Sequence, residues 1–418
     1  MNLLSKFIPL WIIKLFPVNI VRKQINKISP NTEQIKQATK TIFVDISTIH
    51  NCDSKTGIQR VVRAILLKLI DNPPNGFKIS PVYATKKTNY KAISVHTNSD
   101  YFGGYKPDND YCEMITDHGD IFLALDLCAN IIPFHEREII KWKTNGVKIY
   151  FLVYDILPLS NPEWFTKKSH NNFKCWTRTI ARYSDGVICI SETVRQNVEQ
   201  YFKHKYYLSA LEINTTVIPL GSDLSNSHPS TGEPTNVDLI NRLLENKEYI
   251  LVVGTVEPRK GHSEILKAFD ILWTGNYEIP LLVIVGKAGW KTENLQKTIR
   301  QHKFINKKLM WIDDASDAFL AKLYKNCQGV LIGSFAEGYG LPLVEANYYG
   351  VSILARNLPV FKELSLTNIT FYESSTPFAL SEAISTWIKK DNSGCKRSKV
   401  TTWEISKSQL LKSMNIFD

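Results

Sequence analysis

Short apolar runs alternate with amphipathic stretches along the first half of the chain. Residues 41–45 form an apolar run, and after a polar loop Ile58, Val61, Ile65 and Leu69 recur at helical spacing. Further apolar runs follow at residues 121–125, 147–154, 186–190 and 215–219. Buried parallel strands read as continuous apolar runs and need crossover helices between them, so this order predicts a parallel sheet covered by helices.

The second half of the chain repeats this pattern after a break. Residues 222–237 are rich in Ser, Pro, Asn, Thr and Gly, which favours a linker, assigned here to residues 226–245. Beyond it, apolar runs alternate again with helical faces, at residues 249–253, 281–285, 309–312 and 329–332. The sequence therefore predicts an α/β protein with two Rossmann-like domains, at 41–225 and 246–395, facing each other across a cleft. Ligands are expected at the carboxyl ends of the strands.

The stretch around residues 335–345 predicts a strand, a glycine turn and a helix start. Glu337 and Glu345 flank the Gly-x-Gly of Gly338 and Gly340, and Pro342 suits the first turn of a helix. Glycines allow backbone N–H groups to approach a ligand, and a helix N-terminus favours an anion. Carboxylates accept hydrogen bonds from hydroxyls, so the combination suits a nucleotide-sugar. The alternative is an ordinary turn with two solvated acids.

A second loop carries two cations. Arg259 and Lys260 follow the apolar run at 249–253 and precede a helical stretch. Cations at such a place would neutralise a pyrophosphate and stabilise it as it leaves. The alternative is a solvated basic turn.

The net charge indicates a class of partner, and the cysteines indicate a compartment. The 418-residue chain has a net charge of +11 and a pI near 9.1, which implies an acidic partner surface. Residues 1–40 hold seven Lys and Arg against one Glu and so supply +6 of that excess. The seven cysteines are scattered without a Cys-x-x-Cys pair, which argues against a disulfide framework or a zinc site and indicates a reducing compartment.

The first residues predict a helix that lies on a membrane surface. Apolar residues recur at helical spacing with lysines between them. The stretch at residues 7–21 is interrupted by Pro9, Lys14 and Pro17 and is too short to span a bilayer, and no small-residue cleavage site follows it. The alternative is that this helix packs on the protein's own body. The apolar positions are Leu3, Leu4, Phe7, Ile8, Trp11, Ile12, Leu15 and Phe16.

Several motifs together resemble one enzyme family. The sequence Glu-Gly-Tyr-Gly-Leu-Pro-Leu-Val-Glu at residues 337–345 is similar to the signature of the retaining family 4 glycosyltransferases, which have the two-domain GT-B fold. Residues 249–262 resemble the family's donor-phosphate loop. Matches in the family's order at residues 56–63, 154–158, 190–192 and 218–221 extend the resemblance over most of residues 41–410. The motifs look most like those of bacterial surface-polysaccharide mannosyl- and rhamnosyltransferases.

The resemblance implies roles for individual residues. Glu337 falls on the position that contacts the donor sugar, and Glu345 falls on the one that binds the ribose hydroxyls. Lys260 falls on the phosphate-binding lysine. Many members have an arginine where this chain has Thr255, which leaves the role of Arg259 open. The expected donor-binding residues are Gly57, Thr255, Arg259, Lys260, Gly338, Tyr339, Gly340, Leu341 and Glu345.

Two carboxylates are the expected catalytic residues. We assign Glu337 to positioning and charge stabilisation, not to nucleophilic attack, because retaining enzymes of this family have no firmly established carboxylate nucleophile. Asp155 follows the run at 147–154 and faces the cleft where relatives place a histidine or an aspartate; capping the local turn is its rival role. In the resemblance, residues 396–418 form a last helix that crosses back to the first, acceptor-binding domain.

No metal site or cofactor is expected. Asp108 and Asp110 mimic the metal-binding Asp-x-Asp of the other major glycosyltransferase fold, but they stand in a turn-prone loop without a preceding apolar strand. Asp313 and Asp314 have the same interpretation, and no His-x-x-x-His pair occurs.

The sequence thus predicts a retaining, metal-independent hexosyltransferase, with mannose the favoured sugar. It would act in the cytoplasm at the inner face of a bacterial membrane, on a lipid-linked surface glycan, with no nucleic acid partner. The alternatives are a nucleotide-sugar epimerase of the same fold and a non-catalytic basic membrane-binding scaffold. The Glu–Glu signature disfavours the first, and the presence of Glu337 and Lys260 disfavours the second.

Overall fold

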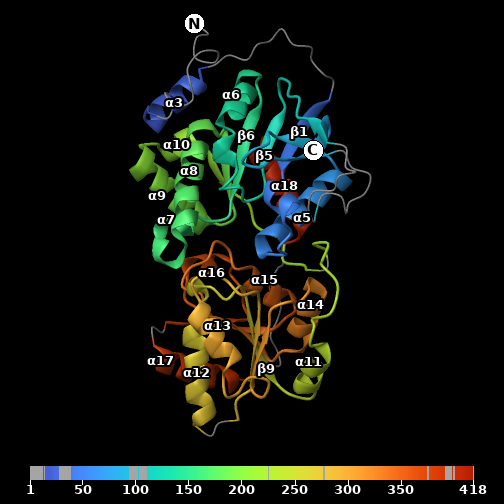
Figure 1. Ribbon diagram of the computed structural model, residues 1–418, viewed down its shortest axis with the longest axis vertical. Coiled ribbons are helices and arrows are strands. Elements are labelled where there is room, and N and C mark those ends of the chain that lie inside the picture. The colour runs from blue at the N-terminus through green and yellow to red at the C-terminus, as the bar shows by residue number, and fades with distance from the viewer. Residues whose placement is uncertain are drawn as a thin grey trace. The chain divides into compact units, whose positions relative to one another are not determined.

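The computed structural model describes residues 13, 15–27, 39–93, 102, 111–224, 226–275, 278–373, 376–390, 398 and 401–417. The chain divides into two units, each built around its own β-sheet (Figure 1). The first unit comprises Met1–Ser160, Lys167–Gly221 and Trp403–Asp418, and the second comprises Asn161–Thr166 and Ser222–Thr402. The last helix therefore belongs to the first unit although it follows the second unit in sequence.

An eight-stranded sheet forms the centre of the first unit, in the order β4-β3-β2-β1-β5-β6-β7-β8. Neighbouring strands are parallel from β2 to β8, so the predicted parallel sheet is confirmed there. The sequence analysis did not predict β2, nor the strands β3 and β4, which pair antiparallel at one edge. Strands β3 and β4 are short and partly exposed, so they carry no periodic apolar signal. The strands are β1 (Lys40–Asp45), β2 (Phe77–Tyr83), β3 (Lys91–Ile93), β4 (Tyr111–Glu113), β5 (Ile121–Ala124), β6 (Lys148–Val153), β7 (Gly186–Cys189) and β8 (Thr215–Val217).

Helix α5 illustrates how local sequence fixes an element of this unit. The Thr56 hydroxyl accepts a hydrogen bond from the backbone N–H of Gln59, and the Gln59 side chain accepts one from the backbone N–H of Thr56. This capping box satisfies two backbone donors that the helix start would otherwise leave open. Of the predicted apolar face, Val61, Ile65 and Leu69 are fully buried, whereas Ile58 is partly buried. The described helices are α3 (Val18–Ile25), α4 (Ser47–Asn51), α5 (Gly57–Asp71), α6 (Glu136–Thr144), α7 (Leu157–Ser160), α8 (Lys167–Tyr183), α9 (Glu192–Tyr206), α10 (Ala210–Ile213) and α18 (Trp403–Ser413), with a 3-10 turn at Ile132–Phe134.

The C-terminal helix α18 packs against α5 in the first unit. Its residues Trp403, Leu410 and Leu411 are buried. A Cβ atom added at Gly221 would collide with the Trp403 ring, so a glycine there permits the close approach of α18.

The second unit has a parallel sheet of six strands in the order β11-β10-β9-β12-β13-β14. Alternate residues of β9 face two different apolar clusters: Tyr249 and Leu251 belong to one, and Ile250 and Val252 belong to the other. The sheet is therefore buried on both faces, as its continuous apolar runs predict. The strands are β9 (Tyr249–Val253), β10 (Leu281–Val285), β11 (Leu309–Ile312), β12 (Gly329–Ile332), β13 (Ser352–Arg356) and β14 (Ile369–Tyr372).

Helices connect the strands of the second unit. The sequence analysis did not predict β13, β14 and α17, which form the last part of this unit. The described helices are α11 (Val237–Leu244), α12 (His262–Thr274), α13 (Glu293–Arg300), α14 (Asp317–Asn326), α15 (Leu341–Tyr348), α16 (Pro359–Glu363) and α17 (Pro377–Ile388), with 3-10 turns at Pro162–Trp164 and Pro258–Lys260.

Two observations concern the predicted membrane contact. Of the predicted amphipathic segment 1–40, residues 1–12, 14 and 28–38 lie outside the described residues. None of the helices in the described part of the chain combines the length and the apolar character needed to cross a bilayer.

Candidate active site

The loop after β12 is the centre of the candidate site. Residues 333–340 connect β12 to α15, which begins at Leu341 with Pro342 in its first turn. Gly340 precedes the helix with a φ of 106°, a left-handed backbone that favours glycine. Because the helix begins at Leu341, Glu345 lies in its second turn.

The loop after β9 lies directly against the loop after β12. Strands β9 and β12 are neighbours in the sheet, so the loops at their carboxyl ends meet. The backbone N–H of Phe335 donates to the carbonyl oxygen of Arg259 over 2.8 Å. Gly261 has a φ of 71°, and a Cβ atom there would collide with the carbonyl oxygen of Gly333. Glycine is thus required where the two loops touch.

Four side chains from these loops form a compact charged group, here called the Glu337 cluster: Arg259, Lys260, Ser334 and Glu337. Arg259 contacts one carboxylate oxygen of Glu337 over 2.6 Å, and Lys260 contacts the other over 2.5 Å. The Ser334 hydroxyl donates to the second oxygen over 2.7 Å. The Glu337 side chain is 9% exposed, so this is a nearly buried ion cluster and not a pair of solvated acids and bases.

The charge state of Glu337 follows from its neighbours. Burial by itself would raise the pKa of this carboxyl, but the positive charges of Arg259 and Lys260 outweigh burial and lower the pKa to about 2. Glu337 is therefore ionised at neutral pH. Arg259 also contacts the carboxylate of Glu257 over 2.9 Å, so each cation of the cluster already has a carboxylate partner.

The remaining donor-loop residues surround this cluster. Gly254 follows β9 with a φ of 144°, and a Cβ atom there would press on the Lys260 side chain. The carbonyl oxygen of Thr255 lies 3.2 Å from Nε2 of His262, whose burial lowers its pKa to about 4. Tyr339 is buried between Gly338 and Gly340. The sequence-predicted residues of the second unit therefore lie on the two meeting loops, except for Leu341 and Glu345, which belong to α15.

Glu345 lies deeper than predicted. Its side chain is buried, and one carboxylate oxygen accepts a hydrogen bond from the Tyr324 hydroxyl over 2.8 Å. Tyr324 belongs to α14 and stacks on Tyr349 with the ring centres 5.6 Å apart. No sequence pattern indicates this partner, because Tyr324 stands 21 residues before Glu345.

The expected residues of the first unit lie at the start of a helix and just after a strand. Gly57 is the first residue of α5, and Asp155 follows β6. One carboxylate oxygen of Asp155 accepts a hydrogen bond from the backbone N–H of Leu157 over 3.1 Å. Asp155 therefore caps the turn that leads into α7, which is the rival role that the sequence left open.

A pair of buried carboxylates in the first unit was missed by the sequence analysis. Asp45 accepts hydrogen bonds from Ser47 and from the Tyr90 hydroxyl. Asp126 accepts them from the backbone N–H groups of Ile49, over 2.7 Å, and of Leu127. Both are fully buried, and burial raises the pKa of Asp45 and raises the pKa of Asp126 to about 7.

The structure also places the acidic pairs that the sequence analysis discounted. Asp313 is half-exposed and pairs with Arg300 over 3.0 Å, and Asp314 accepts hydrogen bonds from Thr235. Asp108 and Asp110 lie outside the described residues. Within the part of the chain that the structure describes, no three His, Cys, Asp or Glu side chains are grouped so as to hold a metal ion.

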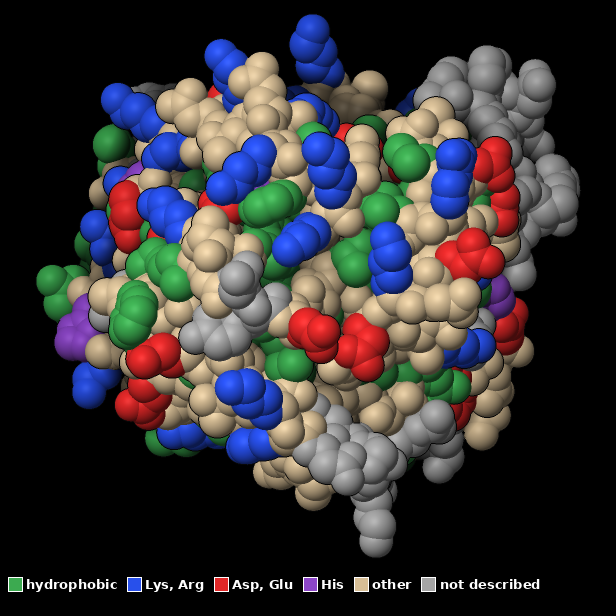
Figure 2. All heavy atoms as spheres, turned by 90° about the horizontal axis from the view of Figure 1, so that it is seen from below, with side chains coloured by type: hydrophobic (Ala, Val, Ile, Leu, Met, Phe, Trp, Pro, Cys, Tyr) green, Lys and Arg blue, Asp and Glu red, His purple; other side chains and the backbone are tan. Residues whose placement is uncertain are grey.

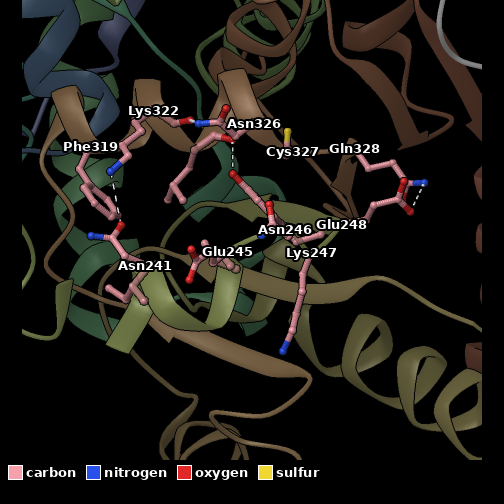
Figure 3. Close-up of a pocket in the computed structure, with 14 residues that line it drawn as sticks. Asn241, Glu245, Asn246, Lys247, Glu248, Phe319, Lys322, Asn326, Cys327 and Gln328 are labelled. Atoms are coloured by element: carbon pink, nitrogen blue, oxygen red, sulfur yellow. Dashed lines mark hydrogen bonds between the residues drawn. The ribbon is translucent and has the colours of Figure 1, made fainter. Parts of the chain in front are cut away.

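A cavity of about 590 Å³ lies at the other end of the second sheet (Figure 3). It lies between α11 and α14, and Tyr249, the first residue of β9, and Gln328, just before β12, line it. The Glu337 cluster follows the carboxyl ends of the same two strands. The cavity therefore lies at the opposite edge of the sheet and is not part of the candidate active site.

Comparison with known proteins identifies the second unit. Residues 238–400 match the family model of glycosyl transferases group 1. Over 387 residues the chain is 33% identical to the serotype-specific mannosyltransferase WbdA of Escherichia coli. That match covers 91% of this chain but 47% of WbdA, so the chain spans about half the length of the WbdA relatives it matches.

Solved structures show the same fold. HepE from Anabaena, crystallised with UDP and glucose, superposes with a TM-score of 0.57 and 16% identity, covering 91% of this chain and 96% of HepE. The catalytic domain of starch synthase IV from Arabidopsis thaliana, bound to ADP and acarbose, gives 0.59 and 12%, covering 91% and 99%. At these identities the likeness establishes the fold alone, which is the two-domain GT-B fold.

Proposed function

Because residues 238–400 of this chain belong to the glycosyl transferases group 1 family, we propose that the chain transfers a hexose from a nucleotide-sugar to a growing surface glycan. Mannose is the favoured hexose, since WbdA is named a mannosyltransferase. The observation that carries the proposal is the Glu337 cluster, in which two cations and one carboxylate meet at the ends of two adjacent strands.

The cluster suggests how a donor diphosphate is recognised. In the structure, Arg259 and Lys260 are each paired with carboxylates. A diphosphate carries more negative charge than one carboxylate, and phosphate oxygens accept strong charge-assisted hydrogen bonds from both cation types. The donor would therefore draw the two cations from Glu337, while the backbone N–H groups of residues 338–341 and the start of α15 add further donors.

Release of Glu337 from its partners would make it available to the sugar. An ionised carboxylate accepts hydrogen bonds from sugar hydroxyls, and the positive charges of Arg259 and Lys260, which would remain close by on the diphosphate, favour the ionised form of Glu337. In the proposed reaction the bond between the anomeric carbon and the diphosphate breaks, and the diphosphate keeps the bonding electrons. The acceptor hydroxyl oxygen forms the new bond on the same face and passes its proton to the departing phosphate. Arg259 and Lys260 stabilise the charge that develops on the leaving group.

The remaining residues take supporting roles. Glu345 would bind the ribose hydroxyls, which requires the nucleoside to approach the Tyr324–Glu345 hydrogen bond. Gly57 and Asp155 would serve the donor and the acceptor from the first unit. No metal ion takes part in this proposal.

Transfer with purified protein tests the function. The full chain is incubated with GDP-mannose, dTDP-sugars and UDP-sugars in turn, and release of the nucleoside diphosphate and transfer to mannose-containing oligosaccharides are measured, with and without EDTA. We expect turnover with one donor, unchanged by EDTA, with the anomeric configuration retained by NMR.

Two variants test whether turnover depends on the Glu337 cluster in particular. Glu337→Gln should lower turnover by about 100-fold or more if its contacts strengthen in the transition state, whereas the half-exposed control Asp313→Asn should not change it. Failure to use any donor, or an unimpaired Glu337→Gln enzyme, would refute the proposal.

We further propose that the glycan is lipid-linked and that the chain works at the inner face of an anionic membrane. The support is the positive charge of residues 1–40 and the exposure of Leu15, Phe16 and Ile20 in the described part of that segment. Flotation with anionic vesicles at low and high salt tests it, because charge attraction is screened by salt whereas apolar insertion is not.

A further inference from the structure

The segment around α3 is fixed to the first unit by a buried arginine. Arg22 is 5% exposed, and its guanidinium donates to the carbonyl oxygens of Ala181 on α8 and Glu212 on α10, over 3.1 and 2.6 Å. Val18, Val21 and Ile25 are buried on the same side of the helix. One face of α3 therefore packs on the protein's own body. The apolar positions of the predicted amphipathic helix precede α3, and most of them lie outside the described residues.

The other face of this segment is apolar and uncovered. Leu15 is 74% exposed, and Phe16 and Ile20 are each about half-exposed. Because Arg22 joins α3 to the carbonyl oxygen of Glu212, the neighbouring residue Leu211 belongs to the same side of the unit, and α3, α9 and α10 lie together in Figure 1. Leu211 is 96% exposed, the highest value among the large apolar residues that the structure describes.

The turn between α9 and α10 adds a second exposed side chain. Tyr207 ends α9 in a left-handed conformation, with a φ of 57°, and is 78% exposed. A non-glycine residue rarely adopts this backbone, which here turns the chain sharply between α9 and α10. Tyr207 and Leu211 are here called the α9–α10 elbow.

Basic residues surround these apolar side chains. The last turn of α9 carries Lys203 and Lys205, both exposed, and α3 carries Lys23, with Lys27 just beyond it. The one acidic side chain on α10 is Glu212. By contrast, the face of the second unit seen in Figure 2 mixes basic, acidic and small apolar areas without one broad apolar patch.

We propose that the α9–α10 elbow and the outer side of α3 form one docking surface for an anionic lipid bilayer, with the elbow inserting Tyr207 and Leu211 between lipid headgroups. Protruding apolar side chains within a ring of lysines match the chemistry of such an interface. A second copy of the chain fits less well, because it would bring lysines against lysines. The inference rests on the proposed membrane location. A full chain that does not bind anionic vesicles would refute both, whereas a full chain that binds them with or without the elbow side chains would refute the elbow alone.

Flotation of the full chain with vesicles of equal parts phosphatidylcholine and phosphatidylglycerol tests the surface. Tyr207→Ser/Leu211→Ser should bind at least about tenfold more weakly, the effect of losing the burial of one or two large apolar side chains. The control Ile115→Ser removes an apolar side chain of the same unit that is 80% exposed and should bind as the wild type does.

A second variant and its control test the contribution of the lysines. Lys203→Ser/Lys205→Ser should bind vesicles more weakly than the wild type at low salt and as well as the wild type at high salt. The control Lys87→Ser/Lys91→Ser replaces two lysines that are exposed elsewhere on the unit and should bind as the wild type does. Wild-type binding by the elbow variants would overturn the proposal. So would a change in oligomeric state by light scattering without a change in vesicle binding, because a second copy would then cover the face.

Discussion

Replacing Glu337 by Gln should destabilise the second unit by an amount that depends on pH. The carboxylate is nearly buried and is held by Arg259, Lys260 and Ser334. Its pKa falls from the ordinary value of 4.5 to about 2 on folding. A difference of one in pKa corresponds to about 1.4 kcal/mol, so ionisation of Glu337 favours the folded state by about 3 kcal/mol at pH 7. Removing one partner of a buried ion pair costs a similar amount, about 3–5 kcal/mol.

The sign of the pH dependence follows from the lowered pKa. A carboxyl with a depressed folded-state pKa stabilises the fold fully above its unfolded pKa of 4.5 and loses that contribution as the pH falls toward 2. The gap between the wild type and Glu337→Gln should therefore narrow from about 3 kcal/mol at pH 7 to about 1.4 kcal/mol near pH 3.

Urea unfolding at a series of pH values measures this gap, and hydrogen exchange at the amides of β9 and β12 confirms that the second unit is the part that responds. Asp313→Asn is the matched control, because it breaks an ion pair of the same unit whose side chains are both about half-exposed. It should cost no more than about 1 kcal/mol. A gap that stays constant from pH 7 to pH 3, or that equals the control, would refute the account of the cluster.

Three further predictions concern other buried groups. Lys260→Ala should weaken nucleoside diphosphate binding by about 1.5–3 kcal/mol in calorimetry, because a charge-assisted hydrogen bond is lost, whereas the exposed Lys267→Ala should leave the affinity unchanged. Tyr324→Phe should lower the free energy of unfolding by about 1–3 kcal/mol, because it removes a donor from the buried carboxylate of Glu345; an unchanged urea midpoint would contradict the prediction. Asp126 has a raised pKa of about 7, so the folded state binds more protons than the unfolded state between the ordinary value of 3.8 and 7, and stability falls as the pH rises through this window. Asp126→Asn should remove up to about 1.4 kcal/mol per pH unit of that fall, and parallel pH profiles of the two proteins would exclude this role.

The sequence determined the local structure of the site and the class of the fold. The apolar runs specify strands that are buried on both faces, because a parallel sheet needs apolar residues at every position. The glycines and Pro342 specify a sharp turn and a helix start at residues 338–342, since these residues fix the backbone without help from distant parts of the chain. The order of the motifs added the two-domain glycosyltransferase fold, which the structure and its neighbours confirm.

Only the tertiary structure decided which charges meet. Arg259 and Lys260 stand 78 and 77 residues before Glu337, and they contact it because β9 and β12 are adjacent in the sheet. Strand order depends on how helices pack over the whole sheet, and no local pattern records it.

The tertiary structure also decided which side chains are buried and which are exposed. Glu345 and Leu211 both occupy helices, yet packing against α14 encloses Glu345, whereas Leu211 is left open to solvent. A sequence pattern states what each side chain prefers. Whether that preference is met depends on which surfaces the folded chain brings together.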